Sequence, residues 1–269
     1  MASNPSKPVS IVLVHGAFVD ASGWRKVYEI LTHEGHEVLV AQNSAVTFAQ
    51  DVERTKGVIA EAANPVVLVG HSYGGAVITE AGIDEKILSL VYLAAFVPDA
   101  GESVLDLASQ EVPGAEKAPL LPPKDGFIKI DPLKFAAAFS ADIDPVEAQF
   151  MAAAQRPWGL EAVQGKITSA AWKAKPSFYL LATEDRMIPA QAQAAMAARA
   201  GAAVVEVRSS HAVMLSEPEE VAALITNAAK LNQQDDAERQ LLSTSITDWG
   251  YYAQLSYADT FTDTTDITD

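Results

Sequence analysis

The stretch VVLVGHSYGGAV, Val66–Val77, decides the expected fold of this 269-residue chain. Its first four residues are apolar and predict a buried strand, Val66–Val69, and a helix-like pattern over Ser72–Ala81 follows directly. Ser72 stands at the turn between them, with a glycine two residues before it and another two residues after it. This is the pattern of a nucleophile elbow, in which small neighbours let a serine adopt a strained backbone conformation beside a helix N-terminus. An ordinary glycine-rich turn is the alternative, and the rest of the chain decides between the two.

Apolar runs and helical patterns alternate on both sides of this stretch. The predicted strands are Val9–Val14, Glu37–Ala41, Val66–Val69, Ile87–Ala95, Ser177–Ala182 and Val204–Val207. The predicted helices are Ser22–Glu34, Ala49–Ala62, Ser72–Ala81, Ala190–Ala200 and Pro218–Leu231. Such alternation predicts an α/β fold with a mostly parallel, six-stranded sheet that carries helices on both faces.

One segment interrupts the alternation. Between residues 98 and 175 no strand is convincing, a proline-rich stretch is expected to be irregular, and helical patterns are confined to Lys134–Phe139 and Pro145–Gln155. We expect residues 98–175 to form a helical cap after the fourth strand, over the carboxyl ends of the strands. Residues 1–97 and 176–232 would form the core, and 233–269 an acidic tail with interleaved aromatic residues.

Composition limits the classes of partner. The net charge of −16 disfavours nucleic acid and anionic membranes, and the chain contains no cysteine, which excludes disulfides, thiolate catalysis and Cys-ligated metals. The first residues do not form a signal peptide, and no apolar run is long enough to span a bilayer. A cytoplasmic protein with a small-molecule substrate is expected, and a homodimer is left open.

A serine nucleophile needs a base, and the histidines differ in where the predicted topology places them. His211 follows the sixth strand and therefore emerges on the same sheet edge as Ser72. His71 should point away from the nucleophile, and His15, after the first strand, more readily shapes its own loop. The acid that orients the base should follow a neighbouring strand, where Glu184 and Asp185 both stand. Asp99, after the fourth strand, is a weaker alternative.

Two backbone donors should stabilise an oxyanion. One is expected to be the N–H of Tyr73, the residue after the nucleophile, and the other an N–H of the loop after the first strand. In that loop Ala17 is the first candidate and Phe18 the second. Apolar side chains on these loops should line the substrate pocket, with Phe18, Phe96, Met187 and Met214 as the leading candidates. Cap side chains join them as weaker candidates, namely Leu105, Phe135, Phe139, Phe150 and Trp158.

Four motifs together resemble the α/β-hydrolase superfamily: HGAF at His15–Phe18, GHSYGG at Gly70–Gly75, TEDRMIP at Thr183–Pro189 and SSHAVMLSEP at Ser209–Pro218. The sequences of these motifs are similar to those of small bacterial esterase-like members and of the plant methylesterase and hydroxynitrile lyase branch. The resemblance implies an α/β-hydrolase fold with a site that uses no metal and no cofactor. It also favours Asp185 over Glu184, because Asp185 and Pro189 match the superfamily pattern G-x-x-D-x-x-x-P, with Ala182 in place of the glycine.

The expected activity is hydrolysis of a carboxylic ester of a small, largely apolar substrate through Ser72, His211 and Asp185. Hydroxynitrile lyases that resemble this chain carry threonine at the position of Gly16 and lysine at that of Ala212, so cyanide release is disfavoured. Two alternatives remain: lyase, perhydrolase or cofactor-free oxygenase chemistry on the same residues, and a binding protein with this fold.

Overall fold

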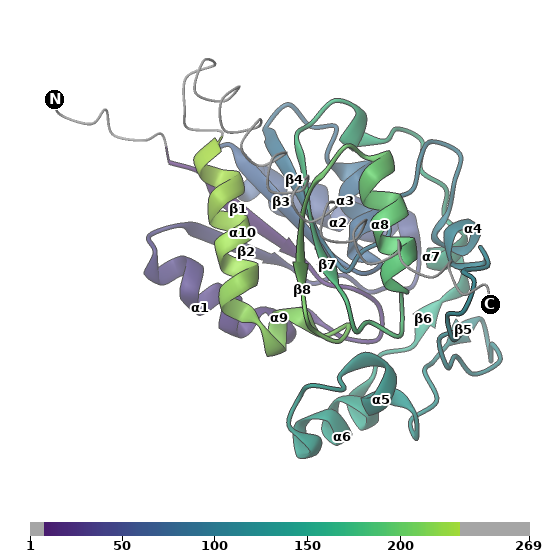
Figure 1. Ribbon diagram of the computed structural model, residues 1–269. Coiled ribbons are helices and arrows are strands. Elements are labelled where there is room, and N and C mark those ends of the chain that lie inside the picture. Colours follow the sequence, from purple (N-terminus) through teal and green to yellow (C-terminus); the bar gives the residue numbers. More distant parts are fainter. Residues whose placement is uncertain (1–7, 232–269) are drawn as a thin grey trace, which may run out of the picture.

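The computed structural model describes residues 8–231 and contains a six-stranded sheet in the order β2-β1-β3-β4-β7-β8 (Figure 1). All neighbouring strands in this sheet run parallel. The strands are β1 (Ser10–Val14), β2 (Glu37–Ala41), β3 (Val66–His71), β4 (Ile87–Leu93), β7 (Ser177–Ala182) and β8 (Ala203–Val207). The predicted fold class is confirmed, and the sheet is fully parallel.

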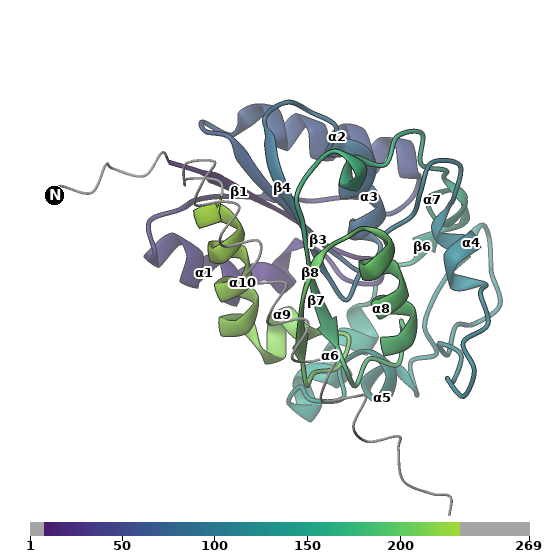
Figure 2. The same ribbon diagram turned by 45° about the horizontal axis from the view of Figure 1, so that its top comes forward.

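Side chains alternate between the two faces of the sheet, so each strand contributes to two separate cores. Ile11 and Leu13 of β1 pack on one side and Val12 and Val14 on the other. The first face is covered by the 3-10 helix η1 (Ala21–Trp24), α1 (Arg25–His33), α9 (Val213–Ser216) and α10 (Pro218–Leu231). The opposite face is covered by α2 (Phe48–Glu61), α3 (Gly74–Ala81) and α8 (Ala190–Arg199), as Figure 2 shows.

The segment between β4 and β7 holds short elements that lie beside the sheet rather than in it (Figure 1). They are α4 (Val104–Ala108), β5 (Phe127–Ile128), α5 (Phe135–Phe139), α6 (Pro145–Ala154), β6 (Trp158–Gly159), α7 (Leu160–Gln164) and the 3-10 helix η2 (Ala171–Lys173). The expectation of no strand in this segment is wrong, because β5 and β6 pair antiparallel. Two-residue strands are too short to produce an alternating sequence pattern.

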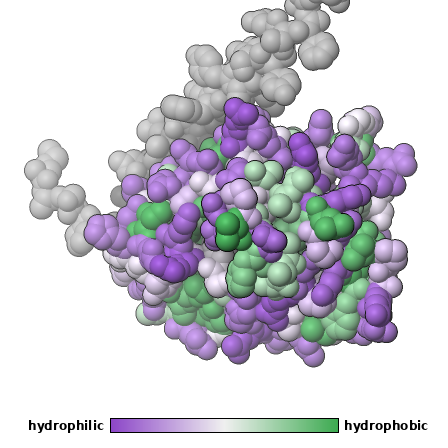
Figure 3. Space-filling model, turned by 90° about the horizontal axis from the view of Figure 1, so that it is seen from below, coloured by the Kyte–Doolittle hydropathy of each residue, from purple (hydrophilic) through white to green (hydrophobic). Residues whose placement is uncertain are grey.

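The buried side of the cap joins the core cluster that contains α2, α3 and α8, through residues that include Phe135, Phe139 and Trp158. Its outer side leaves Leu133, Val146 and Phe150 exposed. Figure 3 views the molecule from the α5–α6 end, and its hydrophobic residues form separate groups between hydrophilic ones. Among residues 8–231, no helix combines the length and the apolar character needed to cross a membrane. The predicted tail, 233–269, lies outside the described residues.

Parallel pairing brings the carboxyl ends of the strands to one edge of the sheet. Val14 at the end of β1 pairs with Gly70 of β3, and Leu93 of β4 pairs with His71. The loops that follow β1, β3, β7 and β8 therefore leave from the same edge, and these loops carry the predicted site residues.

Candidate active site

Ser72 occupies a sharp turn between β3 and α3. Its φ is +55°, in the left-handed region that non-glycine residues avoid at a cost of about 1–3 kcal/mol. The strand pairing continues one residue past β3, because the Ser72 N–H donates to the Leu93 carbonyl at 3.2 Å. A Cβ on Gly70 would stand 2.6 Å from the Gly74 carbonyl oxygen, so the turn requires glycine there. The helix begins at Gly74, two residues later than predicted, and Ser72 lies just before it.

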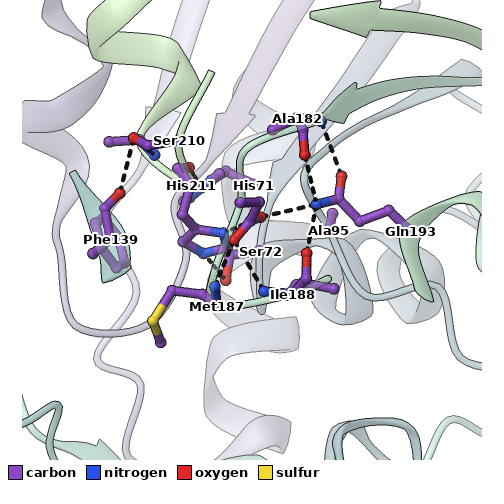
Figure 4. A network of polar contacts seen from close by, with 12 residues as sticks. His71, Ser72, Ala95, Phe139, Ala182, Met187, Ile188, Gln193, Ser210 and His211 are labelled. Atoms are coloured by element: carbon purple, nitrogen blue, oxygen red, sulfur yellow. Dashed lines mark hydrogen bonds and ion pairs between the residues drawn. The ribbon is translucent and has the colours of Figure 1, made fainter. Parts of the chain in front are cut away.

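A chain of two hydrogen bonds connects Ser72 to His211 and His211 to Asp185. Ser72 and His211 lie side by side at the centre of Figure 4. The Ser72 hydroxyl lies 2.9 Å from His211 Nε2, and His211 Nδ1 lies 2.7 Å from Asp185 Oδ2. All three are buried, with 7%, 1% and 6% exposure for Ser72, His211 and Asp185. Because the carboxylate accepts a hydrogen bond from Nδ1–H, the proton of the neutral imidazole stays on Nδ1. The lone pair of Nε2 then faces the serine hydroxyl. The structure thus brings together the three residues that the sequence analysis selected.

The other two candidate acids, Glu184 and Asp99, do not take part in the Ser72–His211–Asp185 hydrogen bonds. Glu184 Oε1 pairs with Arg208 Nε at 2.6 Å on the exposed side of the β7 loop. Asp99 Oδ1 pairs with Lys173 Nζ at 2.5 Å near η2. Both carboxylates are therefore engaged by cations outside the site.

Gln193 is a site residue that the sequence analysis missed. Its buried Nε2 donates to Asp185 Oδ2 at 2.9 Å and to the Ile188 carbonyl at 2.7 Å, and its Oε1 accepts from the Ala182 N–H at 3.1 Å. Asp185 Oδ1 accepts in addition from the amides of Met187 and Ile188, at 2.7 and 3.0 Å. Both carboxylate oxygens are thus fixed while one faces His211. A glutamine in a helix carries no sequence signal for this role, since the helical pattern accounts for it equally well.

Replacing Gln193 with leucine should lower both stability and activity. The change leaves the buried Ala182 N–H and one Asp185 hydrogen-bond site unpaired, which is expected to lower the free energy of unfolding by about 1–3 kcal/mol. A less constrained Asp185 should lower kcat/KM for an ester by about 10-fold. Urea unfolding and initial rates measure the two effects. Gln191→Leu, at an exposed position of the same helix, is the matched control, and a Gln193→Leu protein that equals wild type in both would contradict the assignment.

His71 lies beside His211 without touching the serine hydroxyl. The two imidazole centroids are 4.7 Å apart, and His71 Nε2–H donates to the His211 carbonyl at 2.8 Å. Within the described residues His71 Nδ1 has no hydrogen-bond partner. Burial, together with repulsion from His211, holds the pKa of His71 well below its usual range. A neutral His71 therefore supports the backbone of His211 and adds no charge beside it.

The loop after β1 approaches Ser72 closely. A Cβ on Gly16 would stand 2.7 Å from the Ser72 Cβ, so a larger residue does not fit there. His15 shapes this loop, because its Nδ1–H donates to the Gly16 carbonyl at 2.8 Å and its Nε2 accepts from the Asn43 N–H at 3.0 Å. Burial lowers the pKa of His15, in accord with this neutral tautomer.

The predicted oxyanion donors differ in whether they are engaged. In the described part of the chain, the amide N–H groups of Ala17 and Tyr73 donate no hydrogen bond, whereas Phe18 forms an antiparallel β-bridge with Arg156 of the cap. Phe18 has a φ of +67°, and its carbonyl accepts from the Arg156 N–H at 3.0 Å, which fixes this loop to the cap. Of the two candidates for the second donor, Ala17 is therefore the one whose N–H has no partner within the described residues.

Tyr73 is held by Asp51, a second contact that the sequence analysis missed. The Tyr73 hydroxyl donates to Asp51 Oδ2 at 2.8 Å, and Asp51 Oδ1 accepts from the amides of Ser44 and Ala45 at 2.9 and 3.1 Å. Burial, with the nearby Asp51, raises the pKa of Tyr73 well above its usual range, so the phenol stays a donor. The residue that carries the predicted oxyanion N–H is therefore fixed at both its backbone and its side chain.

The surroundings of Ser72 are apolar. Phe18 and Phe96 are buried in the core cluster that includes the cap, and Met187 packs against it. Trp158 of the cap contacts Phe18 and Tyr73, with ring centroids 5.5 and 5.3 Å apart. The Phe139 ring packs edge-on against His211 at 4.8 Å. Aromatic side chains of the cap thus pack over the site, Phe139 on His211 and Trp158 on Phe18 and Tyr73.

Three predicted pocket positions differ from this picture. Met214 lies in the other core, with Trp24 and Leu224, because α9 turns it toward the layer formed by η1 and α10. Leu105 of α4 and Phe150 of α6 are exposed, at 41% and 71%. None of the three is placed with Phe18, Phe96 and Met187.

Comparison with known proteins gives a consistent match. The family model described as the alpha/beta hydrolase family matches residues 11–224. A carbendazim-hydrolysing esterase from Nocardioides sp. (strain SG-4G) is 39% identical over 118 residues, 39% of this chain and 49% of that protein, so the match spans about half of the relative's length. Methylesterase 1 from Arabidopsis thaliana is 27% identical over 222 residues, covering 71% of this chain and 84% of that protein.

Solved structures agree on the fold. The crystal structure of a pyrethroid hydrolase from Sphingobium faniae JZ-2 superimposes with a TM-score of 0.71 at 22% identity. The superposition covers 82% of this chain and 98% of that protein.

Proposed function

Because this chain belongs to the alpha/beta hydrolase family, we propose that it is a serine hydrolase that cleaves a carboxylic ester of a small, largely apolar substrate. The observation that carries the proposal is the buried hydrogen-bond chain from the Ser72 hydroxyl through His211 to Asp185, set below apolar side chains. Two relatives named as esterases, from Nocardioides and Arabidopsis, support the reaction class.

The first half-reaction forms an ester between substrate and enzyme. His211 Nε2 takes the proton of the Ser72 hydroxyl while Oγ bonds to the substrate carbonyl carbon, whose π electrons move onto the carbonyl oxygen. The amides of Tyr73 and of Ala17 or Phe18 donate to this oxyanion. When the oxyanion collapses, the bond to the alcohol oxygen breaks and the leaving alcohol takes the proton from His211. Asp185 stabilises the imidazolium between these steps.

The second half-reaction returns the enzyme to its starting state. A water molecule gives its proton to His211 Nε2 and attacks the acyl carbon, and the same amides hold the second oxyanion. Collapse breaks the bond to Ser72 Oγ, which recovers its proton from His211, and the carboxylic acid leaves.

The aromatic side chains beside Ser72 support a neutral substrate. Phe18 and Phe139 are apolar, and Trp158 adds only a neutral indole N–H, which is buried and has no hydrogen-bond partner within the described residues, so none of the three offers a countercharge for an anionic group. Arg156 reaches the oxyanion loop, but its guanidinium lies 3.3 and 3.4 Å from the Asn43 and Ser44 carbonyls. A cation that is bonded to backbone carbonyls is less available to a substrate carboxylate.

A panel of p-nitrophenyl esters with increasing acyl length tests the proposal together with labelling by a fluorophosphonate probe. The expected results are turnover that favours short or medium acyl chains and one probe molecule per chain, located on Ser72 by peptide mass spectrometry. Absence of both turnover and labelling would overturn the proposal. Labelling of Ser72 with slow turnover of every ester would instead shift the assignment to lyase or perhydrolase chemistry on the same residues.

A further inference from the structure

A polar contact joins the cap to the loop that carries His211. Asp142 lies between α5 and α6, and Ser210 lies between β8 and α9, directly before His211. The Ser210 N–H donates to Asp142 Oδ2 at 2.8 Å, and the Ser210 hydroxyl donates to Asp142 Oδ1 at 2.5 Å. One carboxylate therefore accepts both polar hydrogens of the residue next to the proposed base.

The remaining contacts of Ser210 point to the same role. Its hydroxyl also lies 3.2 Å from the Phe139 carbonyl, a contact visible in Figure 4. Phe139 in turn packs its ring against the His211 imidazole. Ser210 is 1% exposed, so its N–H depends on a protein acceptor for a hydrogen bond.

The His211 loop is thus held from two directions. From the core, His71 binds the His211 carbonyl and Asp185 binds the imidazole. From the cap, Asp142 binds the backbone and side chain of Ser210. Contacts on both sides of one residue fix the position of its backbone, and the Ser72–His211 hydrogen bond depends on that position.

We propose that Asp142 is a positioning residue for ester cleavage and that it aligns His211 through Ser210. The alignment of the base then depends on the position of the cap relative to the core. The inference rests on the proposed function, because it assumes that His211 activates Ser72. Partial burial alone would raise the pKa of Asp142, but the hydrogen bonds from the Ser210 side chain and backbone lower it. Asp142 is therefore a carboxylate at neutral pH, with both oxygens able to accept.

Asp142→Ala is the direct test, since it removes both acceptors. The buried Ser210 N–H then loses its acceptor, while the Ser210 hydroxyl keeps only the Phe139 carbonyl, so the loop is expected to shift. We expect the second-order rate of Ser72 labelling by the fluorophosphonate, and kcat for p-nitrophenyl acetate, to fall about 10- to 100-fold, the range that a misplacement near 1 Å produces. KM should change less than about 3-fold, because the hydrogen bonds of Asp142 run to Ser210 and not to the aromatic side chains beside Ser72.

Asp144→Asn controls for the loss of a negative charge two residues along the chain. Asp144 caps α6 by accepting from the amides of Val146 and Glu147, at 2.9 and 3.2 Å, and asparagine caps helices equally well. Labelling rate and kcat should equal those of wild type. Thermal unfolding of each variant shows whether the cap remains folded.

Ser210→Ala removes the hydroxyl part of the same contact and serves if Asp142→Ala does not fold. It should also lower the labelling rate and kcat, and the double variant should lose no more than Asp142→Ala alone, because Ser210→Ala removes one of the two hydrogen bonds that Asp142→Ala removes. Fully additive losses, or wild-type labelling rate and kcat in folded Asp142→Ala, would overturn the inference while the proposed function stands. Absence of labelling in the wild-type protein would overturn both.

Discussion

Replacing Ser72 with alanine is expected to lower kcat for p-nitrophenyl acetate by about 10⁶-fold and to abolish fluorophosphonate labelling. The substitution removes the oxygen that would bond to the acyl carbon, so no acyl-enzyme can form. Initial rates at saturating ester measure the effect. Alanine also fits the turn no worse than serine, since both need the same positive φ, so the variant should stay folded.

Ser169→Ala is a suitable control, because Ser169 is an exposed serine whose contact with Glu80 runs through its backbone amide. It should retain wild-type rates. Ester turnover by Ser72→Ala within 10-fold of wild type would contradict the proposed mechanism. The hydrogen bond to His211 would then be a buried polar contact with no catalytic use.

Replacing Asp185 with asparagine is expected to lower kcat by about 10⁴-fold with the fold retained. Asparagine presents either an amide NH2 or a single carbonyl oxygen to His211 Nδ1. With NH2 toward the ring, the imidazole carries its proton on Nε2 and can no longer accept the proton of Ser72. An imidazolium formed in the reaction also loses the carboxylate that stabilises it. Initial rates at neutral pH measure the loss, and circular dichroism checks the fold.

Glu184→Gln makes this test specific, because it removes the neighbouring carboxylate, which pairs with Arg208 at the surface. Its rates should equal those of wild type. A large loss in Glu184→Gln together with a small one in Asp185→Asn would reverse the assignment of the acid. The pair of variants therefore decides experimentally between two residues that strand position alone did not separate.

Much of the fold follows from the sequence because the central strands are buried on both faces and read as apolar runs. Glu37–Ala41, which is only partly buried, and Ser177–Ala182 also end where the apolar runs end, and Pro218–Leu231 has the predicted bounds. Once the strands are parallel, a residue that directly follows one of them must lie at the carboxyl edge. This rule, together with elimination of the other histidines, placed His211 near Ser72, although 139 positions separate them in the chain.

Individual side-chain contacts around the site could not be predicted from the sequence in the same way. Gln193 and Asp51 lie within helices whose apolar periodicity does not depend on them. Their hydrogen bonds to Asp185 and Tyr73 therefore have no recognisable sequence signal. Met214 stands three residues after His211, close enough to suggest a pocket position. The direction of its side chain depends on how the four-residue helix α9 turns, and no short-range pattern specifies that turn.

The cap is joined to the core partly by main-chain hydrogen bonds. Besides the Arg156 N–H to the Phe18 carbonyl, the Gly159 N–H donates to the Ala45 carbonyl at 2.8 Å. Bonds of this kind are independent of side-chain identity, apart from the need for glycine at 159, where a Cβ would overlap Val46. Between these two tethers lies Trp158, which touches the residues around the oxyanion site. A saturation library at position 158 should therefore change which acyl groups are accepted while the cap stays in place, which makes this position a natural starting point for directed evolution of substrate range.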